Sequence, residues 1–133
     1  MSVRLDSAAP ADAVAKVMSV ALAEVAAGDS LRVVAEELTA DEIGAVVVRV
    51  RGAVVGLVSE RDLAAVVAAG GDVESVQAAD VMSTELITVD AGASIAATGE
   101  AMLEAGMRHV LVERDAGIVG VVSIRDVLLT GSR

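Results

Sequence analysis

The chain has 133 residues and a net charge of −10, with no Cys, no Phe, Tyr or Trp, and a single His. Without Cys it can form neither a disulfide nor a zinc–thiolate site, and one His cannot build a multi-histidine metal centre. The acidic balance and the missing aromatic residues argue against a nucleic-acid surface, which uses clustered cations and stacking side chains. A catalytic constellation is equally hard to assemble, so we expect no enzyme.

The N-terminal region differs from a signal peptide and from a membrane span. Residues 1–12 contain Asp6, Pro10 and Asp12 where a signal peptide has its apolar centre. The apolar stretch 13–27 is short and is interrupted by charged residues. We therefore expect a cytoplasmic protein without a membrane partner.

The first half of the chain is expected to fold as β-α-β-β-α. A run of helical composition from Ala11 leads to Val17-Met18-Ser19, and Gly70-Gly71-Asp72 later begins a linker. The five elements between are a strand near 22–25, a helix over 30–41, strands over 45–50 and 53–58 that turn at Arg51-Gly52, and a helix from Glu60 to about Ala69.

The second half repeats this order at an offset of 64 residues. Val17-Met18-Ser19 recurs as Val81-Met82-Ser83, and no gap is needed between Ala15 and Asp62. Such a duplication predicts two similar units, each too small to bury both faces of its sheet alone. We expect Met18 and Met82 to fill the core. The elements of the second copy are a strand over 86–89, a helix over 94–105, strands over 110–112 and 118–122 that turn at 115–117, and a helix over 125–129.

A strand-to-helix junction occurs in both copies. It reads Gly-Leu-Val-Ser-Glu-Arg-Asp at 56–62 and Gly-Val-Val-Ser-Ile-Arg-Asp at 120–126. A Ser followed three residues later by an acid is typical of a helix start, where the hydroxyl accepts from an early backbone N–H and the carboxylate reaches back. A purely structural cap is therefore one interpretation of each junction, and ligand contact is the other.

These motifs resemble a pair of cystathionine-β-synthase (CBS) domains, the unit called a Bateman module. The resemblance rests on Val-Met-Ser before the first strand, on Leu-Ile-Thr-Val at 86–89 and on the junction at 120–126, each with a counterpart 64 residues earlier. It covers about residues 13–130. It implies an α/β fold of tandem β-α-β-β-α repeats packed with pseudo-twofold symmetry. The implied divisions are a lead-in 1–12, a first motif 13–69, a linker 70–79 and a second motif 80–133.

The resemblance also implies a ligand. In that family, clefts between the two motifs commonly bind AMP, ADP, ATP or S-adenosylmethionine. The junction Asp typically holds the ribose hydroxyls and the junction Ser contacts ribose or phosphate. Carried over by position, these residues are Ser59 and Asp62 in one cleft and Ser123 and Asp126 in the other. The further implied contacts are Arg61, Thr88, Arg108, His109 and Arg125.

The two copies differ at these implied positions. Glu24 stands where the second copy has Thr88, and it would repel phosphate unless a proton donor lay opposite. Gly44 and Ala45 stand where the second copy has Arg108 and His109. We therefore expect the second copy to be better equipped for a charged nucleotide.

The expected function is a stand-alone regulatory or sensor module that binds an adenosine-containing ligand and signals to an unknown protein partner. Family members commonly form flat dimers through their helices, and a homodimer is expected here. The apolar residues suited to that interface are Leu63, Val66, Val67, Val127 and Leu128. The alternative function is a protein-interaction or assembly module whose clefts bind no nucleotide.

Overall fold

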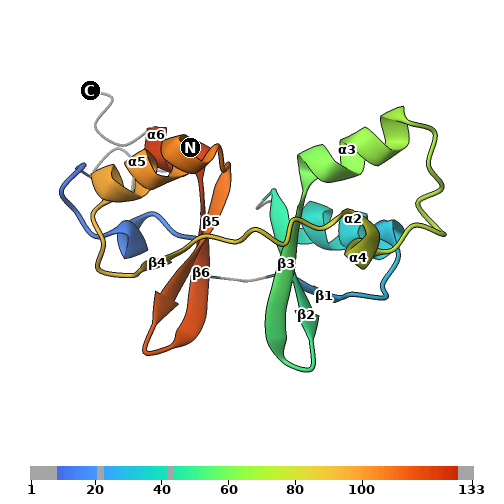
Figure 1. The fold of residues 1–133 in the computed structure, drawn as a ribbon, viewed down its shortest axis with the longest axis horizontal. Helices are drawn as coiled ribbons and strands as arrows, with labels where there is room; N and C mark the ends of the chain where they lie inside the picture. Colours follow the sequence, from blue (N-terminus) through green and yellow to red (C-terminus); the bar gives the residue numbers. More distant parts are fainter. Residues whose placement is uncertain (1–8, 21–22, 42–43, 129–133) are drawn as a thin grey trace. The chain divides into compact units, whose positions relative to one another are not determined.

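The computed structural model describes residues 9–20, 23–41 and 44–128, which form parts of two compact units. Unit 1 combines residues 1–20 with 87–133, and unit 2 comprises residues 21–86. Each unit contains a three-stranded mixed sheet with helices against it (Figure 1). The predicted α/β class and the repeated β-α-β-β-α order are confirmed.

Unit 2 contains the five elements of the first copy and one further short helix. Its β1 runs parallel to β2, which pairs antiparallel with β3. One face of this sheet carries Val25, Val46, Val48 and Val58, which pack with Leu31 and other apolar residues into the unit's core. The elements are β1 Glu24–Ala26, α2 Leu31–Asp41, β2 Ala45–Val50, β3 Ala53–Ser59, α3 Glu60–Ala68 and α4 Ala78–Val81.

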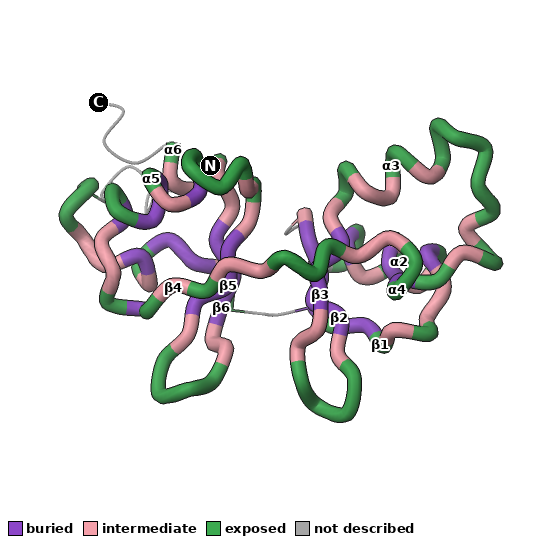
Figure 2. Tube along the Cα trace, viewed as in Figure 1, coloured by how far each residue is buried: buried purple, intermediate pink, exposed green. Residues whose placement is uncertain are grey.

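Unit 1 repeats the same sheet in the same register. Thr88 lies opposite Leu111 as Glu24 lies opposite Val47, and His109 lies opposite Ser123 as Ala45 lies opposite Ser59. The elements are the 3-10 helix η1 Val14–Lys16, β4 Thr88–Asp90, α5 Ile95–Ala105, β5 His109–Arg114, β6 Gly117–Ser123 and α6 Ile124–Leu128. The purple segments in Figure 2 include the central strands β2 and β5 and parts of α2 and α5.

The helix predicted from Ala11 is wrong, because only the short η1 forms there. The backbone N–H groups of Val14 and Ala15 donate to the carbonyls of Ala93 and Ala91, at 2.7 and 3.2 Å. Tertiary hydrogen bonds to the second copy thus replace helical ones. Sequence reasoning also missed α4, whose N-cap residue is Gln77. The Gln77 backbone N–H donates to the Asp80 carboxylate at 2.9 Å.

The two Val-Met-Ser motifs pack crosswise, each in the unit built on the other copy. Met18 is buried in the core of unit 1, and Met82 packs against the core of unit 2. The backbones of Ser19 and Val121 exchange hydrogen bonds of 2.9 and 3.1 Å, and those of Ser83 and Leu57 exchange bonds of 2.8 and 3.1 Å. Each Val-Met-Ser motif therefore supports the other copy's junction, and the prediction that both Met residues fill the core is confirmed.

Two glycines make this close packing possible. A Cβ atom on Gly120 would lie 2.6 Å from Met18 Sδ and 2.9 Å from the Ser19 carbonyl oxygen. A Cβ atom on Gly56 would lie 2.5 Å from Met82 Sδ. Each junction glycine is thus required because a methionine thioether packs directly against it. The spacing of the motifs in the sequence did not reveal this role.

The helices differ between the copies more than the sheets do. In unit 1, α5 and α6 pack so closely that a Cβ atom on Gly99 would lie 2.7 Å from Val127 Cγ1. In unit 2 the equivalent residue is Ala35, and α3 stands away from α2 (Figure 1). A groove of about 670 Å³ opens there. It is lined by Arg32, Ala35, Glu36, Thr39, Ala40, Leu63, Val67, Val73 and Glu74.

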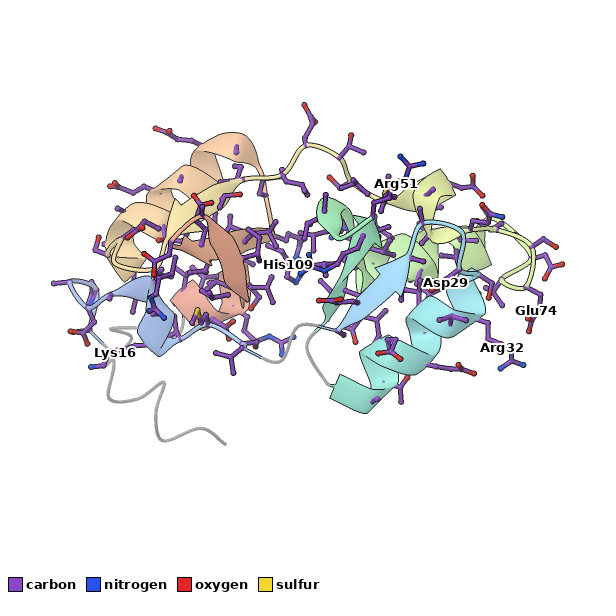
Figure 3. The ribbon with its side chains drawn as sticks, turned by 90° about the horizontal axis from the view of Figure 1, so that it is seen from below. Lys16, Asp29, Arg32, Arg51, Glu74 and His109 are labelled. Atoms are coloured by element: carbon purple, nitrogen blue, oxygen red, sulfur yellow. The ribbon has the colours of Figure 1, made fainter. Side chains whose placement is uncertain are left out.

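An ion pair lines this groove. Arg32 on α2 bonds through its Nε to the Glu74 carboxylate, and the two side chains lie close together in Figure 3. Hydrogen bonding to Glu74, with the charges of Glu74 and Glu36, raises the pKa of Arg32 above its usual value. The residues predicted to be a linker therefore pack against unit 2, where Val73, Val76 and Ala78 contact its core.

Substitution of the junction glycines tests the crosswise packing. We expect Gly120→Ala to lower the free energy of unfolding by about 1–3 kcal/mol, because the added methyl meets a backbone oxygen that cannot move aside. Gly56→Ala should cost less, since the atoms that its methyl would meet belong to the Met82 side chain. Urea unfolding measures both.

Gly28→Ala is the matched control, because nothing lies within 4 Å of its Cβ position. It should change the free energy of unfolding by no more than about 0.5 kcal/mol. Equal effects of the three substitutions would contradict the crosswise packing.

Candidate functional site

The two junctions are complete capping boxes. In unit 1 the Ser123 backbone N–H donates to Asp126 Oδ2 at 3.1 Å, and the Asp126 backbone N–H donates to Ser123 Oγ at 3.2 Å. In unit 2 the same two bonds between Ser59 and Asp62 measure 2.9 and 3.1 Å. All four residues are half-buried. The capping interpretation is thus correct at both junctions, and ligand contact by the same atoms stays a prediction.

The β5–β6 register brings two further predicted residues to the unit 1 junction. His109 on β5 pairs directly with Ser123, which places their Cβ atoms about 5 Å apart. The Ile124 backbone N–H donates to the Arg108 carbonyl at 2.8 Å, so Arg108 is fixed beside the first turn of α6. His109 is half-buried on its strand (Figure 3), and Arg108 is exposed. The start of α6 therefore brings together a hydroxyl, a carboxylate, an imidazole and a residue that carries a guanidinium group.

Thr88 lies farther away. It lies on β4, the edge strand on the other side of β5. Thr88 pairs with Leu111, which in turn pairs with Val121, whereas the pair of His109 and Ser123 lies two residues farther along the strands. Strand spacing and rise put its Cα roughly 12 Å from that of Ser123. Because neighbouring side chains alternate between faces, Thr88 and Ser123 share the face opposite the unit's core. Thr88 thus marks the far end of the same surface.

The two predicted arginines of the junctions are exposed. Arg125 lies in the first turn of α6, and Arg61 lies in the first turn of α3. Each stands directly before the capping Asp in the chain, so it is close to the junction without belonging to the capping box.

The unit 2 junction has the same backbone but different side chains. Glu60 N–H donates to the Gly44 carbonyl at 2.9 Å, and Ala45 lies opposite Ser59. At the far end, Glu24 Oε2 and Arg49 Nε form an ion pair at 2.9 Å. Arg49 is a cationic neighbour of Glu24 that was not identified from the sequence. The signal that would have identified it is a difference between the copies, since the position 64 residues later is Glu113.

The residues that the structure describes contain neither a cluster suited to a metal ion nor a helix suited to a membrane. Across 9–20, 23–41 and 44–128, no three or more Asp, Glu or His side chains gather as a metal site would require. Within the same ranges, no helix is both long and apolar enough to cross a bilayer.

Comparison with protein families identifies the class. The model of the CBS domain matches residues 14–69 and again residues 78–131. These two matches cover most of the chain, which therefore belongs to the CBS-domain family.

The similar proteins include one solved with a nucleotide. A CBS domain protein of Pyrobaculum aerophilum in complex with AMP is 29% identical, has a TM-score of 0.75, and aligns over 86% of this chain and 88% of its own. The hexameric CBS-CP12 protein of bloom-forming cyanobacteria has a TM-score of 0.81 over 90% of this chain and 71% of its own. At 15% identity it shares the fold alone.

A plant relative is also similar in sequence. The CBS domain-containing protein CBSX3, mitochondrial, of Arabidopsis thaliana is 33% identical over 99 residues, which are 70% of this chain and 48% of that protein. The chain spans about half the length of the curated relatives that it matches.

The capping role can be measured separately from any ligand. We expect Ser123→Ala and Ser59→Ala each to lower the free energy of unfolding by about 1 kcal/mol, because each leaves a backbone N–H of the first helical turn without its acceptor. Urea unfolding without ligand reads this effect.

Ser83→Ala is the control, since Ser83 is exposed and bridges to Leu57 through its backbone. It should leave the midpoint nearly unchanged. A loss of stability as large as that of Ser123→Ala would mean that the junction hydroxyls have no special capping role.

Proposed function

We propose that the protein is a regulatory module, without catalysis of its own, that binds an adenosine-containing ligand at its strand-to-helix junctions. The Ser123–Asp126 junction is the stronger of the two sites. The observation that carries this proposal is the pairing of His109 with Ser123 and of the Arg108 carbonyl with the first N–H of α6. The AMP complex of the Pyrobaculum aerophilum protein supports the choice of ligand class.

The chemistry of the Asp126 carboxylate suits both roles. An ionised Asp has two oxygens, each of which accepts hydrogen bonds. Asp126 Oδ2 accepts from the Ser123 N–H within the cap. A cis-diol offers two O–H donors side by side, and a carboxylate is a strong acceptor for both. We expect ribose hydroxyls to bind at Asp126 while the cap stays formed.

The neighbours of Ser123 suit phosphate. Arg108 and Arg125 are cationic, and an imidazole such as that of His109 has a ring N–H of the kind that donates to phosphate oxygens. AMP, ADP and ATP are the ligands that this group of donors favours. Thr88 lies at the other end of the face, where its hydroxyl would meet the base. Signalling follows if the ligand binds one conformation better than another and a partner protein recognises that conformation.

The unit 2 junction is proposed as a second site with other ligand preferences. Ser59 and Asp62 have the same geometry as their counterparts, and Arg61 is the nearest cation along the chain. The placement of both sites in clefts between the two motifs, and a cytoplasmic location, stay predictions. S-adenosylmethionine remains a candidate ligand.

A protein-interaction or assembly module is the second candidate function. The observation that favours it is that both capping boxes are complete, so Ser and Asp have a structural role at each junction. The α2–α3 groove also offers an apolar surface, on which Val67 is 60% exposed.

Nucleotide titration tests the first candidate. We expect AMP or ATP at about 100 times its dissociation constant to stabilise the protein by about 2.7 kcal/mol in thermal unfolding. Asp126→Asn should abolish most of this gain, because the amide keeps an acceptor for Ser123 N–H but loses the charge and one acceptor for the diol.

Asp62→Asn is the matched control for the ranking of the sites, and it should remove less of the gain. If no adenine nucleotide at millimolar concentration stabilises the wild type, the binding proposal fails and the assembly module is favoured. If Asp62→Asn removes the gain and Asp126→Asn does not, the ranking is wrong.

Oligomeric state is a separate prediction. Of the apolar residues predicted to form a dimer interface, Leu63, Val66 and Val127 pack partly against the core of their own unit, whereas Val67 and Leu128 are 60% and 64% exposed. We expect a dimeric mass by light scattering at micromolar concentration.

Val67→Asp should shift this mass toward the monomer, because a carboxylate would be buried in the interface. Leu103→Asp, at a 70% exposed position on α5, should leave the mass unchanged. A monomeric wild type, or a hexamer such as the cyanobacterial protein forms, would contradict the prediction.

A further inference from the structure

The two copies differ in how closely their helices pack. In unit 1, Val127 of α6 packs against Gly99 of α5. In unit 2 the equivalent of Gly99 is Ala35, and the α2–α3 groove of about 670 Å³ lies between the helices. Along α3, Glu60–Ala68, no residue is fully buried. Because a helix this short owes its stability to the packing of its apolar face, α3 has a face that a further element can cover.

The walls of the groove have the spacing that a third helix requires. Leu63 and Val67 are four residues apart on α3, and Ala35 and Thr39 are four residues apart on α2. Residues at this spacing form a row along a helix, and the furrow between two such rows accepts a row of side chains from another helix. Val67 is 60% exposed, so the groove is open to solvent rather than enclosed like a pocket for a small molecule. This shape favours helix-in-groove recognition.

The groove lies on the strongly acidic part of the chain. Residues 21–86, which form unit 2, contain twelve acidic and four basic residues, so they carry −8 of the net charge of −10. The segments 31–41 and 60–74, which supply the lining residues, contain seven acidic and two basic residues. Of the two basic residues, Arg32 is already paired with Glu36 and Glu74. The surroundings of the groove therefore attract cations.

A second copy of the chain suits the groove less well. Two copies that faced each other through this surface would bring like charges together, which disfavours the contact. The dimer predicted above also uses Val67, so a partner helix and a second copy would compete for this residue.

We propose that the α2–α3 groove binds a basic amphipathic helix of a partner protein. Its apolar row packs on Leu63 and Val67, and its Lys and Arg side chains face Glu36 and Glu74. This partner chemistry is independent of whether the junctions bind a nucleotide, so the two proposals can fail separately.

Three fluorescein-labelled peptides of about 18 residues, or five helical turns, test the proposal. One has Leu at helical spacing and Lys elsewhere, the second has the same composition in scrambled order, and the third has Glu in place of Lys. In fluorescence anisotropy with the full chain, we expect the first peptide to bind at least about tenfold more tightly than either of the others, because only this peptide combines an apolar row with positive charge. Added salt should weaken its binding.

Substitutions in the two copies locate the binding surface. Glu36→Lys should weaken binding of the first peptide about tenfold through charge repulsion, and Val67→Asn should do the same through lost apolar contact. The matched controls lie at exposed positions of α5. Glu100→Lys makes the same charge change 64 residues later, and Leu103→Asn makes a comparable polar change. Both controls should leave the dissociation constant nearly unchanged, and an unchanged melting temperature shows that each variant is folded.

Equal binding of the scrambled peptide would overturn the proposal, since charge alone would then explain the attraction. An equal loss of binding in Glu36→Lys and Glu100→Lys would overturn it as well. If the wild type binds none of the peptides, the groove does not take a basic helix, and a dimeric mass that falls to that of a monomer in Val67→Asn identifies a second copy as its occupant. In each of these cases the proposed function is decided separately, by the nucleotide titration.

Discussion

The contact between a methionine and a glycine is the constraint on which the rest of the structure depends. Met18 packs on Gly120 and Met82 packs on Gly56. Each junction strand is therefore supported by the Val-Met-Ser motif of the other copy. A side chain on either glycine would displace the thioether and, in unit 1, the backbone of Ser19 as well. Each core therefore includes a segment that lies outside its own β-α-β-β-α repeat.

This packing supports the junction at which the capping bonds and the proposed ligand contacts coincide. The glycine precedes two core residues, the next residue is the N-cap Ser, and the Asp three residues later closes the box. The same hydroxyl and carboxylate stand at a helix start, where backbone N–H groups favour anions. The sites then differ only in the residues around this fixed geometry. His109 and Arg108 adjoin one junction, and the Glu24–Arg49 pair lies across the sheet from the other.

Much of the fold could be predicted because the duplication presents each sequence pattern twice, in the same order. Hairpins, helix caps and strand order recur at one offset, and the structure has them where the pattern placed them. The helix predicted from Ala11 does not form, because backbone hydrogen bonds to Ala91 and Ala93 replace those of a local helix. The periodicity of a sequence does not indicate such distant partners. The crosswise exchange and the Glu24–Arg49 contact were also missed, since both depend on which strands become neighbours. The types and sequence positions of the candidate site residues could be predicted, whereas the distances between these residues across the sheet could not.

A crystal structure of the full chain with AMP is the most direct test of the central claim. The ribose hydroxyls should lie within hydrogen-bonding distance of the Asp126 carboxylate, with the phosphate near Arg108 and His109 and the Ser123–Asp126 cap still formed. AMP bound away from this junction, or bound only at Asp62, would contradict the account.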